Sequence, residues 1–519
     1  MNEPTNIQAI PPVGPAGRPA ASRQADPGQP SSFRQFVLHD RARYWQIAIP
    51  ALIVQFVVFK LMYPFPDFIS DSYNYIDTAA LHLDVNLWPI GYARFMGAIH
   101  RLTASDTALL AAQFGILEIG LLLFFYTFLY FYRPAKNTSS ILFFFIFFNP
   151  LFIWLSNAVL SDALFNALSL FWWVQFIWML HRPRLYQVFV LAGLLGIAFT
   201  IRYTAMYYPI VAALAFVLSA QPRRWKIMGS LLGIVVIIPF VIYTQQKTKE
   251  VTGTAEFSVF GGWQIANNAL YMYDHIEVDS NQLPPGTKEI DRLVRQYFNR
   301  VPPKYRELDP FPGTFFIKIP DAPLKMYSYP HYKSYDAVGQ FQAWGAVSPI
   351  YNRYGTWLIR HYPFSFARYY LWLNTKNYFL PHLEKFGIYN YASDSVWNGA
   401  MYWFQYKTPV VRSVSGQALP AAIFYAYPAV FMLMNIYFIA ALLWLFLTGK
   451  WRRLPPFFIR CLWLLVAYLA MNFAFSIFAT PVVLRYQVMP FLLLFSYSLM
   501  LLELGDQTPN SHTPPPRPS

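Results

Sequence analysis

About ten apolar segments, each long enough to cross a bilayer as a helix, constrain this chain more than any other feature of its sequence. Hydrophobic residues make up 56% of the 519 residues and charged residues only 13%, about half the share typical of soluble domains. A membrane helix needs roughly 17–25 predominantly apolar residues, so the sequence predicts an all-α polytopic membrane protein. The predicted spans are residues 44–63, 107–131, 139–155, 160–180, 185–201, 203–220, 226–245, 421–447, 457–478 and 485–503.

Lys and Arg occupy every second connection between these spans, and none of those four connections contains an acid. They hold Arg133 and Lys136; Arg182 and Arg184; Arg223, Arg224 and Lys226; and Lys450, Arg452 and Arg453. Cytosolic loops of membrane proteins carry the excess of Lys and Arg, so these four loops and both termini are predicted to be cytosolic. The net charge of +15 therefore indicates orientation in the membrane rather than nucleic-acid binding.

Two long connections, residues 64–106 and 246–420, are left on the opposite, outer side. The connection at 246–420 is too long for a simple connection and is expected to fold as a mixed extracytoplasmic domain. The chain ends are rich in Pro, Gly and Ser and poor in apolar residues, which predicts disorder. The predicted parts are a cytosolic tail at 1–32, an N-terminal transmembrane module at 33–245 with an outer loop at 64–106, the extracytoplasmic domain at 246–420, C-terminal transmembrane helices at 421–503 and a second tail at 504–519.

The cysteine and glycosylation patterns bear on the compartment. Cys461 is the only cysteine, so the chain can form no internal disulfide and no Cys-rich metal site. The one Asn-x-Ser/Thr sequence, at Asn137, falls in a predicted cytosolic loop, and residues 246–420 contain none. This favours a bacterial inner membrane over the endoplasmic reticulum.

Five ionisable residues, drawn from several spans, fall at the same outer edge: Asp67, Asp71, Asp162, Arg202 and Arg485. An ionisable group beside hydrocarbon costs roughly 2.5–3.5 kcal/mol on insertion scales, so such a cluster is a functional-site hypothesis by default. Helix capping is the alternative for the carboxylates, and an interfacial anchor beside a tyrosine is the alternative for each arginine. Two arginines on one cleft indicate instead a phosphate clamp, because guanidinium binds phosphate oxygens in a bidentate manner.

The first outer loop is expected to contain a helix that begins near Asp71 and lies along the membrane interface. The dipole of that helix would favour the ionised carboxylate at its N-terminus. Aromatic runs in the second outer segment, at 369–372 and 401–404, fit either an interfacial belt or sugar- and lipid-contacting faces. No GxSxG, HExxH, CxxC, Walker or dinucleotide-binding motif is present in the sequence, so ATP-driven transport is not predicted.

Five short motifs, in this order and on one predicted side, resemble the GT-C glycosyltransferase superfamily, in the branch of protein O-mannosyltransferases and the lipid A aminoarabinose transferase. They are Ser70-Asp71-Ser72-Tyr73, Pro89-Ile90-Gly91-Tyr92, Ser161-Asp162, Thr200-Ile201-Arg202, and Arg485-Tyr486 with Pro490. The chain departs from the pattern at three positions. Ser72 stands where many relatives have Glu, Asp162 where Glu is usual, and Tyr203 where Pro is common.

The resemblance implies transfer of a sugar from a polyprenyl-phosphate donor to a glycan, lipid or protein acceptor on the outer face, with inversion. It implies Asp71 as the general base, Asp162 as a catalytic residue that orients the acceptor or the loop, and Arg202 and Arg485 as ligands of the donor phosphate. Supporting roles fall to Tyr73, Tyr92, Tyr203, Tyr486 and Asp67. No cofactor is predicted, although a divalent metal is compatible with the carboxylates, and membrane lipids are the other expected partners.

Two other classes of function stay open on the sequence. A transporter or flippase of lipid-linked saccharides would use the arginines to hold the phosphate and the carboxylates as proton relays, but no inverted repeat is evident. A polysaccharide polymerase or ligase would also have many spans and a large outer loop. The acidic motif directly after the first span favours the transferase.

Overall fold

The computed structural model describes residues 32–306, 313–479 and 481–506. The predicted tails at 1–32 and 504–519 lie outside these residues except for their inner edges. The chain forms two compact units, 1–43 and 44–519. The described part of the first holds α1 (Phe33–Gln35) and a π-helical turn at Phe36–Asp40.

Every regular element of the second unit, within the described residues, is a helix, and the only strand-like pairings there are isolated bridges. The mixed fold expected for residues 246–420 is therefore corrected to a helical one over the described residues, since Pro stands in the first turn of several of their short helices and the aromatic runs lie largely within helices. The longer elements are α2 (Ala42–Met62), α3 (Ser70–Ala80), α4 (Gly91–His100), α5 (Asp106–Tyr132), α6 (Lys136–Phe147), α7 (Pro150–Ser156), α8 (Asp162–His181), α9 (Tyr186–Ile201), α10 (Tyr208–Leu218), α11 (Arg223–Val235), α12 (Ile238–Thr252), α13 (Val259–Leu270), α14 (Lys288–Arg300), α17 (Ala337–His361), α19 (Trp372–Phe379), α22 (Tyr427–Leu447), α23 (Pro456–Phe478) and α24 (Val488–Asp506).

Shorter helices connect these elements: α15 (Phe315–Lys318), α16 (Pro323–Ser328), α18 (Pro363–Phe366), α20 (Asn398–Trp403), α21 (Leu419–Phe424) and several 3₁₀ turns. Eight helical stretches of the described residues are long and apolar enough to cross a membrane, and two shorter apolar helices follow α8. These stretches coincide with the ten predicted spans. By helix length and composition the chain is a multi-pass membrane protein.

The eighth helix is the most enclosed of the spans. In α8, 83% of the most apolar window is buried, against 17% in α2. A helix that is apolar on all sides must be surrounded by protein or lipid, and α8 packs against α5, α9, α23 and α24. The N-terminus of α8, where Asp162 lies, is therefore held at the centre of the bundle.

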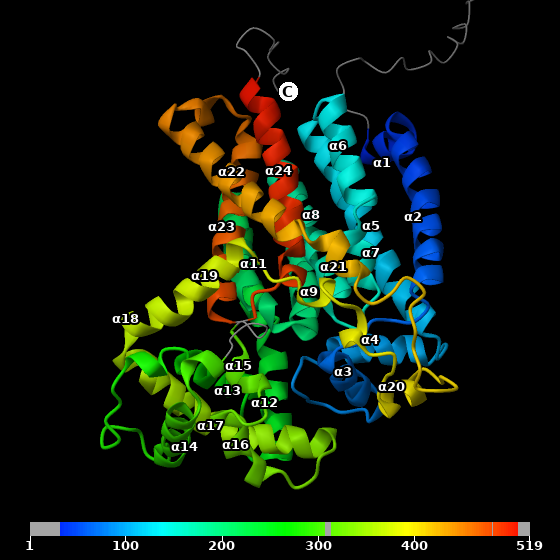
Figure 1. Ribbon diagram of the computed structural model, residues 1–519. Helices are drawn as coiled ribbons and strands as arrows, with labels where there is room; N and C mark the ends of the chain where they lie inside the picture. Colours follow the sequence, from blue (N-terminus) through cyan, green and yellow to red (C-terminus); the bar gives the residue numbers. More distant parts are fainter. Residues whose placement is uncertain (1–31, 307–312, 480, 507–519) are drawn as a thin grey trace, which may run out of the picture. The chain divides into compact units, whose positions relative to one another are not determined.

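The first loop, at 64–106, contains α3 and α4, which lie with α20 at one end of the bundle (Figure 1). The expected helix near Asp71 is confirmed as α3, which begins at Ser70. The connections α5–α6 and α22–α23, which carry predicted cytosolic charges, lie at the opposite end (Figure 1). Which end faces the cytosol stays a prediction.

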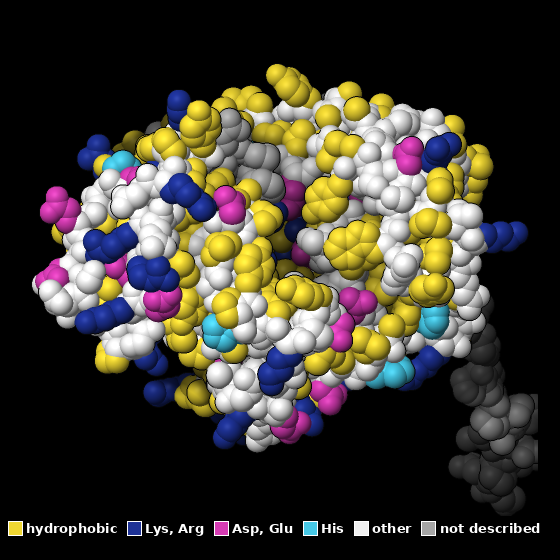
Figure 2. Space-filling model, turned by 60° about the horizontal axis from the view of Figure 1, so that its bottom comes forward, with side chains coloured by type: hydrophobic (Ala, Val, Ile, Leu, Met, Phe, Trp, Pro, Cys, Tyr) yellow, Lys and Arg dark blue, Asp and Glu magenta, His cyan; other side chains and the backbone are white. Residues whose placement is uncertain are grey.

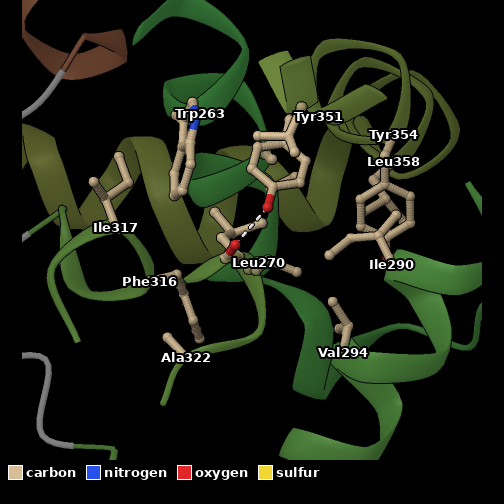
Figure 3. Close-up of a cluster of buried hydrophobic side chains, with 14 of the residues drawn as sticks. Trp263, Leu270, Ile290, Val294, Phe316, Ile317, Ala322, Tyr351, Tyr354 and Leu358 are labelled. Atoms are coloured by element: carbon tan, nitrogen blue, oxygen red, sulfur yellow. Dashed lines mark hydrogen bonds between the residues drawn. The ribbon is translucent and has the colours of Figure 1, made fainter. Parts of the chain in front are cut away.

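Residues 259–370 share a core rich in aromatic side chains, which Val85 and Leu87 of the first loop join. Figure 3 shows Trp263, Tyr351 and Tyr354 in this core, with the Tyr351 hydroxyl donating to the Leu324 carbonyl. The helices α13 and α17 cross closely there. A Cβ on Gly262 would lie 2.0 Å from the Ser348 carbonyl oxygen, so only glycine permits this approach.

Candidate functional site

Arg485 lies at the centre of a cluster of three carboxylates. Its Nε is 2.6 Å from Glu384 Oε2, its Nη1 is 2.8 Å from Asp162 Oδ2 and its Nη2 is 3.5 Å from Asp71 Oδ2. The arginine side chain is only 4% exposed. Because a buried charge is stable only when it is paired and hydrogen-bonded, these carboxylates are what hold the guanidinium there.

Asp162 joins the two arginines that the sequence singled out. Its Oδ2 accepts from Arg485 and its Oδ1 from Arg202, and its side chain is 1% exposed. Both guanidinium groups also face the ring of Tyr486, at 4.3 Å for Arg202 and 4.4 Å for Arg485. Desolvated cation–π contacts of this kind contribute about 2 kcal/mol, so Tyr486 is part of the site.

Two isolated parallel bridges bring the segments of the site together. His382 pairs with Val483, with Leu484 N donating to His382 O at 2.9 Å, which sets Glu384 beside Arg485. Asp67 pairs with Ala158 in the same way, shortly before α8 begins. The site therefore depends on contacts between segments that are far apart in sequence.

Glu384 is a member of this cluster that the sequence analysis did not single out. It lies in the 3₁₀ turn Glu384–Phe386 and has a φ of 46°, which is uncommon for a residue other than glycine. Backbone conformations of this kind cluster at active and binding sites. One signal was present: Glu384 is the only acid between Asp336 and Asp394.

Asp71 is the carboxylate of this cluster that combines exposure with a helix N-terminus. It lies in the first turn of α3, and the N-cap residue of that helix is Ile69. The alternative that Asp71 is an N-cap is therefore wrong. The N-cap residue of α8 is Ser161, and neither Ile69 nor Ser161 makes a side-chain capping bond. The Asp71 side chain is 22% exposed, close to the 25% of Glu384.

The electrostatics of Asp71 suit proton transfer. Burial raises the pKa of its carboxyl above the usual value, and the charges of Glu384 and Asp162 add to the rise, while Arg485 and Lys318 oppose it. A general base is most effective when its pKa lies near the working pH. The surroundings of Asp71 shift it in that direction.

Asp67 is not part of this cluster. It forms a buried ion pair with Lys385 and accepts a hydrogen bond of 2.9 Å from the Asn390 amide. Its backbone amide donates to Asn157 O at 2.9 Å. Asp67 thus ties the first loop to the segment that carries Glu384.

Three of the predicted supporting tyrosines contact side chains other than those of the two arginines. Tyr73 stacks on Trp397 with ring centroids 4.3 Å apart. The hydroxyl of Tyr92 donates to Gln113 Oε1 at 3.0 Å, and Tyr203 packs against Phe257 at 4.5 Å. A residue that was not singled out, Tyr75, reaches the α8 N-terminus, where its hydroxyl donates to Ser161 Oγ at 3.0 Å.

The end of the molecule that carries α3, α4 and α20 is hollowed near the middle of the view in Figure 2. Hydrophobic side chains border the hollow, and acidic and basic side chains are visible inside it. Within the part of the chain that the structure describes, no group of three or more His, Cys, Asp or Glu side chains is arranged to hold a metal ion.

Fold and site together define a multi-pass helical membrane protein with a largely buried cluster of carboxylates and arginines at one end of its bundle. No protein-family model and no curated protein matches the chain. Among solved structures, the arabinosyltransferase EmbB from Mycobacterium smegmatis is similar, at 13% identity and a TM-score of 0.32. The match covers 91% of this chain and 42% of that one, so the chain spans less than half the length of that neighbour.

Proposed function

We propose that this protein is a membrane glycosyltransferase of the GT-C type, which transfers a sugar from a polyprenyl-phosphate donor to an acceptor on the outer face of a bacterial inner membrane. The observation that carries the proposal is the pairing of the partly exposed Asp71 carboxylate with the buried Arg485. A base and a phosphate-binding cation within one cluster are what such a transfer requires.

The proposed reaction transfers one proton to the protein and releases one leaving group. The Asp71 carboxylate accepts the proton of the acceptor hydroxyl as the oxygen forms a bond to the anomeric carbon of the donor. The bond from that carbon to the phosphate oxygen breaks on the opposite face, so the configuration inverts. Polyprenyl phosphate leaves with the bonding electrons, and nearby cations stabilise the charge that develops on it.

The ion pairs of the two arginines determine how they could bind the donor phosphate. Three nitrogen atoms of Arg485 already face carboxylates, so Arg485 reaches a phosphate only by exchanging one partner. The more exposed partners are Asp71 and Glu384, whereas Asp162 is enclosed. Asp162 then acts as the fixed partner that keeps Arg202 and Arg485 aimed at the donor.

The test is an assay for bond cleavage. Purified protein in lipid nanodiscs is incubated with a panel of polyprenyl-phosphate sugars and an envelope extract as acceptor, and free polyprenyl phosphate is measured. The native protein should release it, and Asp71→Asn should lower the rate by about 10²–10⁴-fold, the usual contribution of a general base.

Glu384→Gln is the matched comparison, because Glu384 contacts the same arginine and has a similar exposure. It should retain activity well above that of Asp71→Asn. An inactive Glu384→Gln beside an active Asp71→Asn would move the base to Glu384. Donor that crosses between leaflets and is never cleaved would favour the flippase, and extension of an existing polymer would favour the polymerase or ligase.

A further inference from the structure

The helix α3 has two functional faces. Residues spaced three or four apart share one face of a helix, so Asp71 and Tyr75 point together toward Arg485 and Ser161. Tyr73 and Asp77 share another face, where Tyr73 stacks on Trp397, next to α20. The second face is not used by the chemistry proposed for Asp71.

A cavity of about 810 Å³ lies on this second face, between α3, α4 and α20. This volume is within the range of roughly 300–1,000 Å³ that small-molecule sites occupy. The space exists because the helices present small side chains to it, among them Ala80, Ala93, Gly97 and Gly399. A Cβ built on Gly97 would meet no atom within 4 Å.

Most of the other lining residues are polar or aromatic. Asp77 and Arg101 supply a carboxylate and a guanidinium. The Trp403 ring stacks on His100, with centroids 3.9 Å apart, so its orientation is fixed. Tyr402 lines the same cavity and is 72% exposed, which leaves much of its ring free for a ligand.

This combination favours a saccharide over two other ligands. An acyl chain would leave the charged groups of Asp77 and Arg101 without partners in an apolar contact, which is costly. A phosphate would be repelled by the Asp77 carboxylate. Of the two arginines that line the cavity, Arg94 is already paired with Asp84 at 3.2 Å, so the charge of Arg101 is balanced by that of Asp77. A neutral sugar offers hydroxyls to the ionised groups and an apolar ring face to the tyrosine, as mixed polar and aromatic sites require.

We propose that the cavity between α3, α4 and α20 is a binding site for a neutral saccharide, separate from the Asp71–Arg485 cluster. Saccharide binding there does not depend on the proposed transfer. Its role, to retain an acceptor glycan away from the hydroxyl that reacts, rests on the proposed function.

The test fills the cavity and measures binding. Gly97→Leu directs a side chain into the open space, because a Cβ on Gly97 meets no atom within 4 Å. Gly115→Leu is the matched control, because a Cβ on Gly115 also meets nothing within 4 Å and this residue of α5 does not line the cavity. Saturation-transfer NMR is recorded with mannobiose, galactobiose, cellobiose and arabinobiose.

At least one disaccharide should bind the native protein and Gly115→Leu, and Gly97→Leu should weaken that binding at least tenfold. Tyr402→Ala, an exposed truncation, should weaken it as well and serves if Gly97→Leu does not fold. The proposal is overturned if none of the four binds, if both variants bind like the native protein, or if inorganic phosphate displaces the sugar. Failure of transfer with intact, Gly97→Leu-sensitive binding would refute the proposed function alone.

Discussion

The buried ion pair between Asp67 and Lys385 makes a sharp prediction about stability. Both side chains are at most 5% exposed, and the pair joins the first loop to the turn that carries Glu384. Asp67→Asn keeps an acceptor for the Asn390 amide but removes the negative charge. Lys385 is then left buried without its counter-ion.

Breaking a buried pair by removing one partner costs about 3–5 kcal/mol, so Asp67→Asn should lower the free energy of unfolding by that amount. Burial lowers the pKa of Lys385 well below its usual value. Loss of the Asp67 charge should lower it further, so the folded variant binds fewer protons than the folded native protein, and the deficit should shrink as pH rises toward the usual lysine pKa of about 10.4.

Cys461 gives the assay, because it is the only cysteine and is buried. A fluorogenic maleimide reacts with it on thermal unfolding, which reports an apparent Tm. Asp67→Asn paired with Lys385→Met should recover most of the loss, since no unpaired charge remains. Asp84→Asn, which breaks an exposed pair, should cost at most about 1 kcal/mol. An unchanged Tm for Asp67→Asn, or a double variant no more stable than the single one, would refute the reasoning.

Three further predictions concern the site and its side of the membrane. Arg485→Lys keeps the charge but loses the planar fork, so kcat should fall, by as much as 10²–10³-fold, more than donor affinity; equal losses in both would contradict a role in the transition state. The transfer rate should fall with decreasing pH as Asp71 becomes protonated. Lys318→Gln removes a cation that lowers the Asp71 pKa, so this variant should lose activity at a higher pH than the native protein. An unchanged pH profile would count against Asp71 as the base. A reporter fused after Lys136 should report the cytosol and one near Gly313 the outer side; a cytosolic signal at Gly313 would reverse the orientation.

Much of the fold was predictable from the sequence because it depends on the composition of short segments. A run of about 20 apolar residues must form a helix in a bilayer, where backbone groups have no water to bind. The eight long apolar helices and the two shorter ones could therefore be located without tertiary information. The helix at Asp71 was equally local. The helical fold of the described part of residues 246–420 was not predicted, since short aromatic segments do not by themselves indicate helix or strand.

The charged residues of the site were also visible in the sequence, because a charge beside an apolar span needs a reason. Asp71, Asp162, Arg202 and Arg485 do meet in the structure. What the pattern could not show is how they are paired. Both arginines contact Asp162, so under the proposed function a donor phosphate would have to replace a carboxylate as the partner of an arginine.

By itself, then, the sequence determined the spans and which of their ends carry charge, because hydrophobic length and charge are properties of short segments. The tertiary structure alone decided that Glu384 joins Arg485 and that Asp67 is occupied by Lys385. It also decided that small residues of three helices leave a cavity behind Asp71. Arg485 and Asp162 are 323 positions apart, and contacts over such separations depend on how the whole chain packs rather than on any local pattern.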